Sequence, residues 1–218
     1  MTVTMIDNSF KGSSKSSFIH WLIVNRQALS LPVMLVLAVL IFTVSSPKFL
    51  TLDNLVNVAR QSVYLLIISL GQFMVIARGG LDLSVGSVVS LTSVASATVM
   101  ASVITAYPDA PGLTIVIGLI VGLLVGIVVG MINGLGVSKL HIHPFMMTLG
   151  MSSVLYGVTL LVSGGMPIYG VPPLMGEIFG YGRIIGIPVP TLFALALIIV
   201  VFIVMEWTRF GRHLYAAG

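Results

Sequence analysis

The sequence predicts an all-α integral membrane fold, a polytopic bundle of about six transmembrane helices with a cytoplasmic N-terminus. Of the 218 residues, 57% are hydrophobic and only 7% are charged, whereas soluble domains typically carry about 25% charged residues. The mean hydropathy is +1.14. Long runs without charge recur, each near the ~20 residues that a helix needs to cross a bilayer. Alternating strand patterns do not occur, so helices are expected to satisfy the backbone inside the membrane.

Six apolar runs, free of charge except for Arg60 and Glu206 near their ends, define the predicted spans and, with the basic residues, their orientation. The runs are residues 28–44, 55–77, 83–106, 113–135, 144–164 and 190–206. With the N-terminus inside, seven of the ten basic residues fall in the cytoplasm and three outside, the bias that the positive-inside rule favours. The three outside residues are Lys48, Arg60 and Arg183. Residues 1–27 are then a cytoplasmic tail, and the six spans form one domain, 28–206.

The longest connection, residues 165–189, is external in this orientation and rich in glycine and proline, which break helices into turns. We expect it to hold at most one short re-entrant or interfacial piece, around residues 174–179.

Several function classes are excluded by what the sequence lacks. With no cysteine, the chain is not a disulfide scaffold, an iron–sulfur protein or a cysteine-ligated zinc protein. It has no Walker A loop, HExxH helix or GxSxG elbow, so we expect no enzyme and no cofactor. His141 and His143 alone do not make a metal site. No Asp, Glu, Lys, Arg or His lies in the middle third of a span, which argues against an ion-coupled symporter. The basic excess reflects cytoplasmic loops rather than nucleic-acid binding.

A glycine occurs at every fourth position of the predicted span 113–135. These residues are Gly118, Gly122, Gly126, Gly130 and Gly134. Such a bare stripe lets two helix backbones approach closely, as in GxxxG faces. We therefore predict that these glycines serve helix packing rather than substrate lining.

Serines recur at every third position of the predicted span 83–106. They are Ser84, Ser87, Ser90, Ser93 and Ser96. Packing with hydroxyls bonded to the preceding turn is the favoured interpretation. The alternative is that the hydroxyls line a wet path for a polyhydroxylated solute, and the sequence leaves both open.

The turn between the second and third spans contains Gly80, Asp82, Ser84 and Gly86. Paired glycines permit a tight reversal, and Asp is a preferred N-cap. We expect Asp82 to cap the following helix by accepting its free N–H groups. Gating or contact with a partner is the other interpretation of this turn.

Three stretches together carry a resemblance to a known family. They are residues 80–86 (GLDLSVG), residues 148–151 (TLGM) running to 164–168 (GGMPI), and residues 208–218 (TRFGRHLYAAG). In this order and spacing they resemble the ribose-type permeases of bacterial ATP-binding-cassette sugar importers, over essentially all of residues 30–218. Branched-chain amino acid permeases are more distant relatives.

The resemblance implies a multi-pass subunit of the bacterial inner membrane that passes a monosaccharide, a pentose or hexose, from periplasm to cytoplasm. The implied partners are a cytoplasmic ATPase that hydrolyses the ATP, a periplasmic sugar-binding protein, a second permease subunit in a homodimer, and the lipid bilayer. Residues 207–218 would begin the cytoplasmic coupling loop. Its ATPase-coupling residues would be Thr208, Arg209, Phe210, Gly211 and Arg212.

The resemblance also implies a length difference, because relatives of this kind have about ten spans. We therefore expect residues 1–218 to be the first six spans of a longer domain and not to support sugar uptake alone. Two alternatives remain: a branched-chain amino acid permease, which the neighbouring genes would reveal, and a truncated, non-transporting membrane fragment.

Overall fold

The structure, a computed structural model, describes residues 26–218 in two units, the described residues up to Val56 and Asn57–Gly218. The first unit contains α2 (Arg26–Ser45) and the first turn of α3 (Leu52–Ala77). The ring of Phe42, in the last turn of α2, stacks on the ring of Phe49, which follows the helix, with the two centroids 5.5 Å apart. The predicted tail 1–27 lies outside the described residues, except for Arg26 and Gln27, which belong to α2. The span predicted at 28–44 is helical, and its crossing of the membrane stays a prediction.

Five helices of the described chain are long and apolar enough to cross a membrane. They are α3, α4 (Val85–Ala106), α5 (Pro111–Ser138), α6 (Pro144–Ser163) and α8 (Val189–Trp207). Each coincides with a predicted span to within a few residues at its ends. Proline occupies the first turn of α5, α6 and α8, where the missing N–H costs no hydrogen bond. The prediction of an all-α polytopic membrane protein is confirmed.

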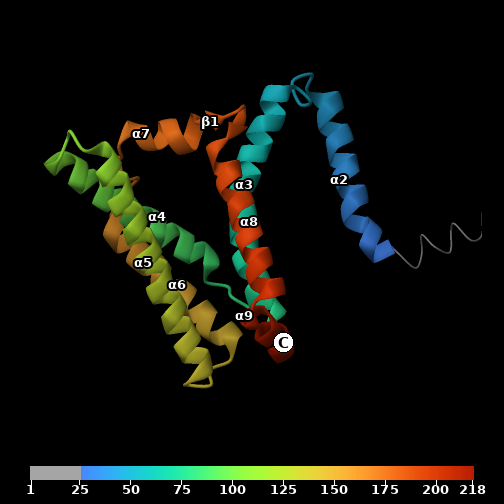
Figure 1. Ribbon diagram of the computed structural model, residues 1–218, viewed down its shortest axis with the longest axis vertical. Coiled ribbons are helices and arrows are strands. Elements are labelled where there is room, and N and C mark those ends of the chain that lie inside the picture. Colours follow the sequence, from blue (N-terminus) through green and yellow to red (C-terminus); the bar gives the residue numbers. More distant parts are fainter. Residues whose placement is uncertain (1–25) are drawn as a thin grey trace, which may run out of the picture. The chain divides into compact units, whose positions relative to one another are not determined.

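Helices α4, α5 and α6 pack together, as the green to ochre ribbons of Figure 1 show. Their shared apolar contact consists of Leu91 on α4, Val129 on α5 and Leu155 on α6. The hydroxyls of Ser87 and Ser152 join α4 to α6 at 2.8 Å. At Gly136, a Cβ would lie 2.5 Å from the Met147 sulfur, so the missing side chain lets α6 approach α5.

The connection between α6 and α8 contains a short helical piece, as predicted, and a hairpin that was not predicted. The helical piece is α7 (Pro173–Met175), continued by the π-helix η1 (Gly176–Tyr181). The hairpin pairs β1 (Arg183–Ile184) with β2 (Ile187–Pro188) in antiparallel register. Its turn residues Ile185 and Gly186 have φ of 53° and 80°, the left-handed conformation of a two-residue type I′ turn.

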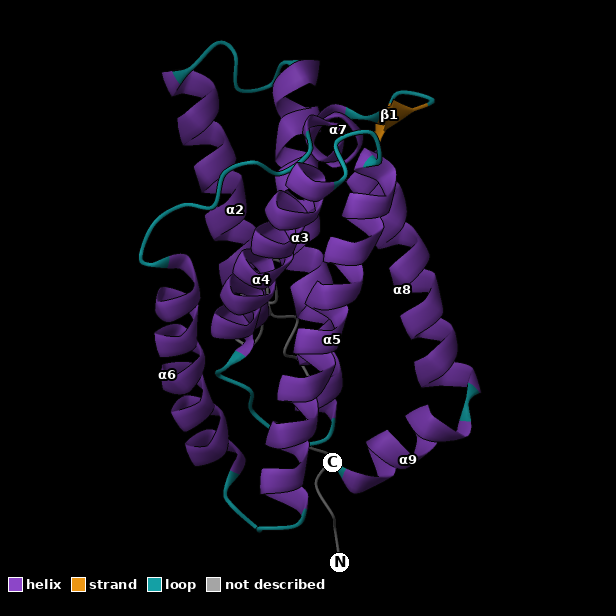
Figure 2. Cartoon of the chain, turned by 90° about the vertical axis from the view of Figure 1, so that its left-hand side faces the viewer, coloured by secondary structure: helices purple, strands orange, loops and turns teal. Residues whose placement is uncertain are grey.

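After α8 the chain turns into a separate helix, α9 (Arg209–Ala217), which leaves the end of α8 at an angle in Figure 2. Thr208 ends α8 with an extended backbone and is the N-cap of α9. Its hydroxyl donates to the Val204 carbonyl at 2.6 Å and accepts the Gly211 N–H at 3.4 Å. The segment expected as the beginning of a loop is therefore a capped helix.

Candidate functional site

The turn before α4 is organised around the Asp82 carboxylate, in a different way from the one predicted. Asp82 Oδ1 accepts the N–H of Ser84 at 2.8 Å and the Ser84 hydroxyl at 2.6 Å. The N-cap of α4 is Ser84, whose side chain makes no capping bond to the helix. The expectation that Asp82 caps the helix N–H groups is therefore wrong. Asp82 instead makes an Asx-type turn that ends where the helix begins, because its short side chain reaches a backbone N–H only two residues on.

Three other helices hold this turn through polar side chains. Thr148 on α6 accepts the Leu83 N–H at 3.1 Å. Gln72 on α3 donates to the Asp82 carbonyl at 2.6 Å. Asn133 on α5 donates from Nδ2 to the Ser84 hydroxyl at 2.9 Å. The turn is thus fixed to α3, α5 and α6 at once.

Sequence reasoning missed Gln72 and Asn133, and it named Thr148 only as part of the TLGM stretch, without this contact. The available signal was that Asn133 is the one amide in the apolar run 113–135, where unpaired polar groups are costly and tend to pair between helices. Gln72 stood out less, because its span also contains Asn57 and Gln61.

Asp82 is half-buried and Ser84 and Asn133 are buried, and the hydrogen bonds among these three residues have one allowed direction. The carboxylate of Asp82 is an acceptor, so the Ser84 hydroxyl must donate to it and accept from the Asn133 amide. Asn133 Oδ1 is then left buried without a partner in the described part of the chain. Since Ser84 is fully buried and Asn133 nearly so, removing any member leaves polar groups without a partner.

Glycines at the turn have different roles. Gly79 has φ of 74°, the left-handed region that a residue with a Cβ seldom adopts. A Cβ at Gly80 would lie 3.1 Å from the Val75 carbonyl oxygen. Gly86, in the first turn of α4, has open space around it within the described chain. The reversal therefore depends on Gly79 and Gly80, while nothing in the described structure requires Gly86.

The glycine stripe of α5 divides into two parts. A Cβ at Gly118 would overlap the Met100 side chain of α4, and one at Gly122 would lie 2.6 Å from the Ser96 hydroxyl. Gly126, Gly130 and Gly134 have no heavy atom within 4 Å of such a Cβ. The first two glycines thus lie where α4 and α5 touch. A packing role for the whole stripe stays a prediction.

The serine stripe of α4 also divides. The hydroxyls of Ser84, Ser87 and Ser90 all form hydrogen bonds, and that of Ser90 donates to the Gly86 carbonyl at 3.1 Å. Ser93 and Ser96 form no hydrogen bond within residues 26–218. Packing and bonding to other groups therefore account for the first half of the stripe and leave the hydroxyls of the second half free.

The two free serines, in the middle of α4, border hollows that residues of the α6–α8 connection also line. Ser93, Ser96 and Thr92 line an open hollow of about 570 Å³ between α4, α5 and α7, which Val171 and Met175 also line. Ser93 also borders a second hollow of about 430 Å³, between α4, α6 and residues 165–168. Both hollows combine apolar walls with a few hydroxyl groups. We call the first one the hydroxyl hollow.

The predicted coupling residues lie together at the start of α9. Phe210 is 56% exposed, and Arg209 and Arg212 are also exposed. Gly211 is buried, and a Cβ there would overlap the Met205 carbonyl of α8. α9 therefore contacts α8 through its glycine and presents its phenylalanine and arginines outward.

The end of α9 reaches the end of α3. A Cβ at Gly218 would overlap the Ala77 carbonyl and lie 2.8 Å from the Arg78 Cα. Ala77 and Arg78 lead directly into the Gly79–Gly86 turn. The predicted coupling segment and the predicted capping turn are therefore neighbours in space, a relation that the sequence did not reveal.

His143 has a structural role at the start of α6. It is the N-cap, and its Nδ1 accepts the Phe145 N–H at 3.3 Å. Within the described residues, no three His, Cys, Asp or Glu side chains are grouped so that they could share a metal ion.

Comparison with known proteins places these features in a family. Residues 54–218 match the family model described as the branched-chain amino acid transport system permease component. The ribose import permease protein RbsC of Bacillus subtilis is 38% identical over 84% of this chain and 55% of its own length. The D-allose transport system permease protein AlsC of Escherichia coli is 35% identical over 84% of this chain and 54% of its own.

A third relative is the galactose/methyl galactoside import permease protein MglC of Salmonella typhimurium, 30% identical over 94% of this chain and 62% of its own length. The chain thus spans a little over half the length of these curated relatives. No solved structure matches it. Because the family model covers most of the described residues, from α3 through α9, the chain belongs to the family of branched-chain amino acid transport system permease components.

Proposed function

We propose that this chain is a transmembrane permease subunit of an ATP-binding-cassette importer that carries a monosaccharide, a pentose or hexose, from periplasm to cytoplasm. Its partners are a cytoplasmic ATPase, a periplasmic sugar-binding protein and a second permease subunit, in the bacterial inner membrane. The observation that carries the proposal is that three similar proteins are named as permeases for ribose, D-allose and galactose.

The hydroxyl hollow supports a polyhydroxylated solute. A sugar must exchange its hydrogen bonds to water for others as it crosses, or its polar groups are left unsatisfied. Ser93 and Ser96 have free hydroxyls, which both donate and accept and so suit sugar hydroxyls in many orientations. No ionisable side chain lines the hollow, so nothing there selects the charged ends of an amino acid.

α9 supports powering by a separate subunit. Its exposed Phe210 and Arg212 offer an apolar anchor and a cation to a cytoplasmic partner. Its buried Gly211 holds it on α8, and its end touches the residues before the Gly79–Gly86 turn. Displacement of α9 by an ATPase would therefore act on α8 and on the turn that α3, α5 and α6 hold. Such a rigid element is the kind that transmits closure of one subunit to another.

Uptake in the source bacterium tests the substrate class. Deletion of the whole gene should abolish uptake of a labelled pentose or hexose and leave leucine uptake unchanged, and the whole gene on a plasmid should restore the sugar uptake. The panel is ribose, allose, galactose and leucine, with Ser93→Val and Ser96→Val as plasmid variants that remove the two free hydroxyls. Loss of leucine uptake with sugar uptake intact would overturn the proposal and favour the amino-acid alternative.

A further inference from the structure

Arg60 is a cationic side chain on the apolar helix α3. The groups that it contacts belong to α3 itself and to η1. Its Nη1 donates to the Gly180 carbonyl, and its Nη2 donates to Asn57 Oδ1 at 3.0 Å. The guanidinium also lies 5.8 Å from the centre of the Tyr181 ring. Within residues 26–218 no acidic side chain pairs with it. A half-buried arginine in a span is costly unless it is paired, so these contacts couple α3 firmly to the end of η1.

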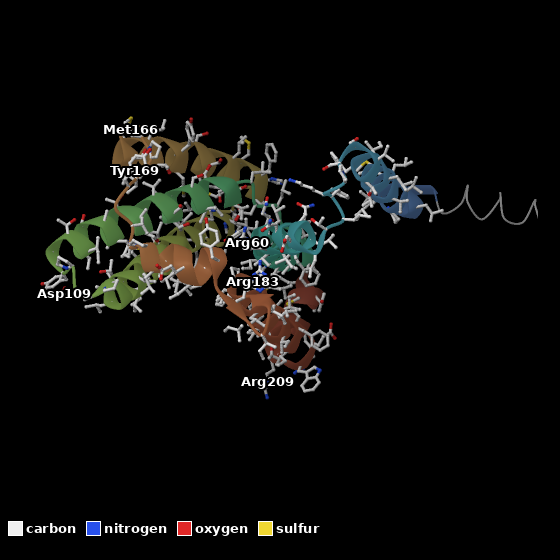
Figure 3. All side chains as sticks on the ribbon, turned by 90° about the horizontal axis from the view of Figure 1, so that it is seen from above. Arg60, Asp109, Met166, Tyr169, Arg183 and Arg209 are labelled. Carbon is white, nitrogen blue, oxygen red and sulfur yellow. The ribbon has the colours of Figure 1, made fainter. Side chains whose placement is uncertain are left out.

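The segment that Arg60 holds is one continuous helical piece, α7 and η1, from Pro173 to Tyr181. A π-helix is rare and is often found at functional positions. Its end is sharply defined, because a Cβ at Gly182 would overlap the Ile178 carbonyl and lie 3.0 Å from that of Glu177. Figure 3 labels Arg60 near this piece, with Arg183 at the start of the hairpin beyond it.

The other end of the same piece borders the hydroxyl hollow. Val171 and Met175 line the hollow together with Thr92, Ser93 and Ser96 of α4. Just before it, a Cβ at Gly170 would lie 3.5 Å from Ala101 Cβ, so the approach to α7 also rests on α4. Met175 is therefore on a helical piece whose far end is bonded to Arg60, and Val171 lies two residues before that piece.

We propose that Arg60 is a positioning residue that holds the α7–η1 piece as a lid over the hydroxyl hollow and so limits entry from the outer face. When Arg60 loses its hydrogen bond to Gly180 and its contact with the Tyr181 ring, the piece pivots about the contact between Gly170 and Ala101 of α4. The proposal deepens the proposed function and rests on it for the outer orientation of the connection. It assigns to Arg60 control of access and no contact with the solute.

The absence of cysteine from the sequence allows a direct test of access. Ser96→Cys places a near-isosteric thiol in the hollow of the otherwise unchanged chain. A charged, membrane-impermeant methanethiosulfonate is added to whole cells, and the initial labelling rate is measured. This reagent reacts with hydrated thiolates, so the rate reports water access from outside.

Arg60→Gln in the Ser96→Cys background should raise the labelling rate at least about fivefold, because loss of a charged hydrogen bond shifts a two-state equilibrium by that much or more. Arg60→Lys keeps the charge but loses the planar guanidinium, so its labelling rate should lie between that of the parent and that of Arg60→Gln. The matched control is Arg183→Gln, which removes an exposed cation from the same connection and should leave the rate unchanged. An equal rate in Arg60→Gln and in the parent would overturn the lid.

Two further cysteines separate the lid from other causes. Ile185→Cys, at the 97% exposed hairpin tip, should label in every background. If it does not, the connection is not outside, and the outer lid is refuted whatever the solute. Ser84→Cys, at a fully buried position, should stay unlabelled by a membrane-permeant maleimide in Arg60→Gln. Its labelling would show general loosening and would refute a local lid. None of these readouts uses a substrate, so failure of the sugar assignment would be seen separately.

Discussion

Ser84→Ala is the substitution that most sharply tests the buried polar turn before α4. The change removes the hydroxyl that donates to Asp82 at 2.6 Å and accepts from Asn133 at 2.9 Å. Asp82 keeps the Ser84 N–H as a partner, but the Asn133 amide is then left with neither of its ends bonded within the described residues. The cost should therefore exceed that of losing one ordinary hydrogen bond.

The magnitude follows from these contacts. Two side-chain hydrogen bonds are worth about 0.6–1.5 kcal/mol each, the lower figure being typical within membranes. Leaving the buried amide donor unsatisfied adds about 1 kcal/mol or more. The sum is about 2–4 kcal/mol. For a chain of this size, that corresponds to a lowering of the melting temperature by about 5–15 °C.

The assay is thermal unfolding of a detergent-solubilised fluorescent fusion. The fraction that stays folded after heating is measured by size-exclusion chromatography. Ser90→Ala is the matched control, because Ser90 is exposed and bonds only to the Gly86 carbonyl of its own helix; it should shift the midpoint by no more than about 2 °C. Combining Ser84→Ala with Asn133→Leu should recover most of the loss, since replacing both partners by apolar groups is nearly neutral. Equal unfolding midpoints for Ser84→Ala and Ser90→Ala would refute the hydrogen bonds among Asp82, Ser84 and Asn133. So would a double variant whose midpoint falls by the sum of the two single losses.

Two further substitutions test packing and coupling. Gly118→Val should destabilise the chain by about 1–3 kcal/mol, because its side chain overlaps Met100, whereas Gly112→Ala, with open space around it, should be nearly neutral; equal unfolding midpoints would show that α4 and α5 do not touch there. Gly211→Val should displace α9 from the Met205 carbonyl of α8 and reduce sugar-stimulated ATP hydrolysis by the assembled importer at least about tenfold if that displacement costs 1.4 kcal/mol or more. ATP hydrolysis that stays at the parent rate in Gly211→Val would contradict a coupling role for α9.

The spans could be predicted from the sequence because their cause is local. A run such as residues 113–135 is apolar throughout, and hydrocarbon leaves a helix as the economical backbone conformation. The breaks were also visible, since Pro111, Pro144 and Pro190 each fall in the first turn of a helix. Ends differed by a few residues, as at α5, which runs on through Gly136 and Val137 to Ser138, because helix ends are less sharply specified by sequence than helix interiors.

Contacts between side chains of different helices could not be predicted from the sequence in this way. Asp82 was assigned as a helix cap from its position alone, but the choice between capping and an Asx turn depends on Ser84 and on Asn133, which is distant in sequence. The glycine stripe looked uniform, yet only Gly118 and Gly122 lie against α4. The hairpin after η1 was missed because its turn uses Ile185 at φ 53°, a β-branched residue that seldom adopts this conformation.

Partner binding through α9 is the claim on which the importer account depends most directly. The chain, with an affinity tag at its N-terminus, is co-expressed with the ATPase encoded beside it and purified in mild detergent. Arg212→Glu reverses an exposed charge on α9, and Arg183→Glu makes the same change on the hairpin connection. The account predicts that the ATPase co-purifies with the parent chain and with Arg183→Glu and is lost from Arg212→Glu. No ATPase with the parent chain, or equal recovery from all three, would contradict it.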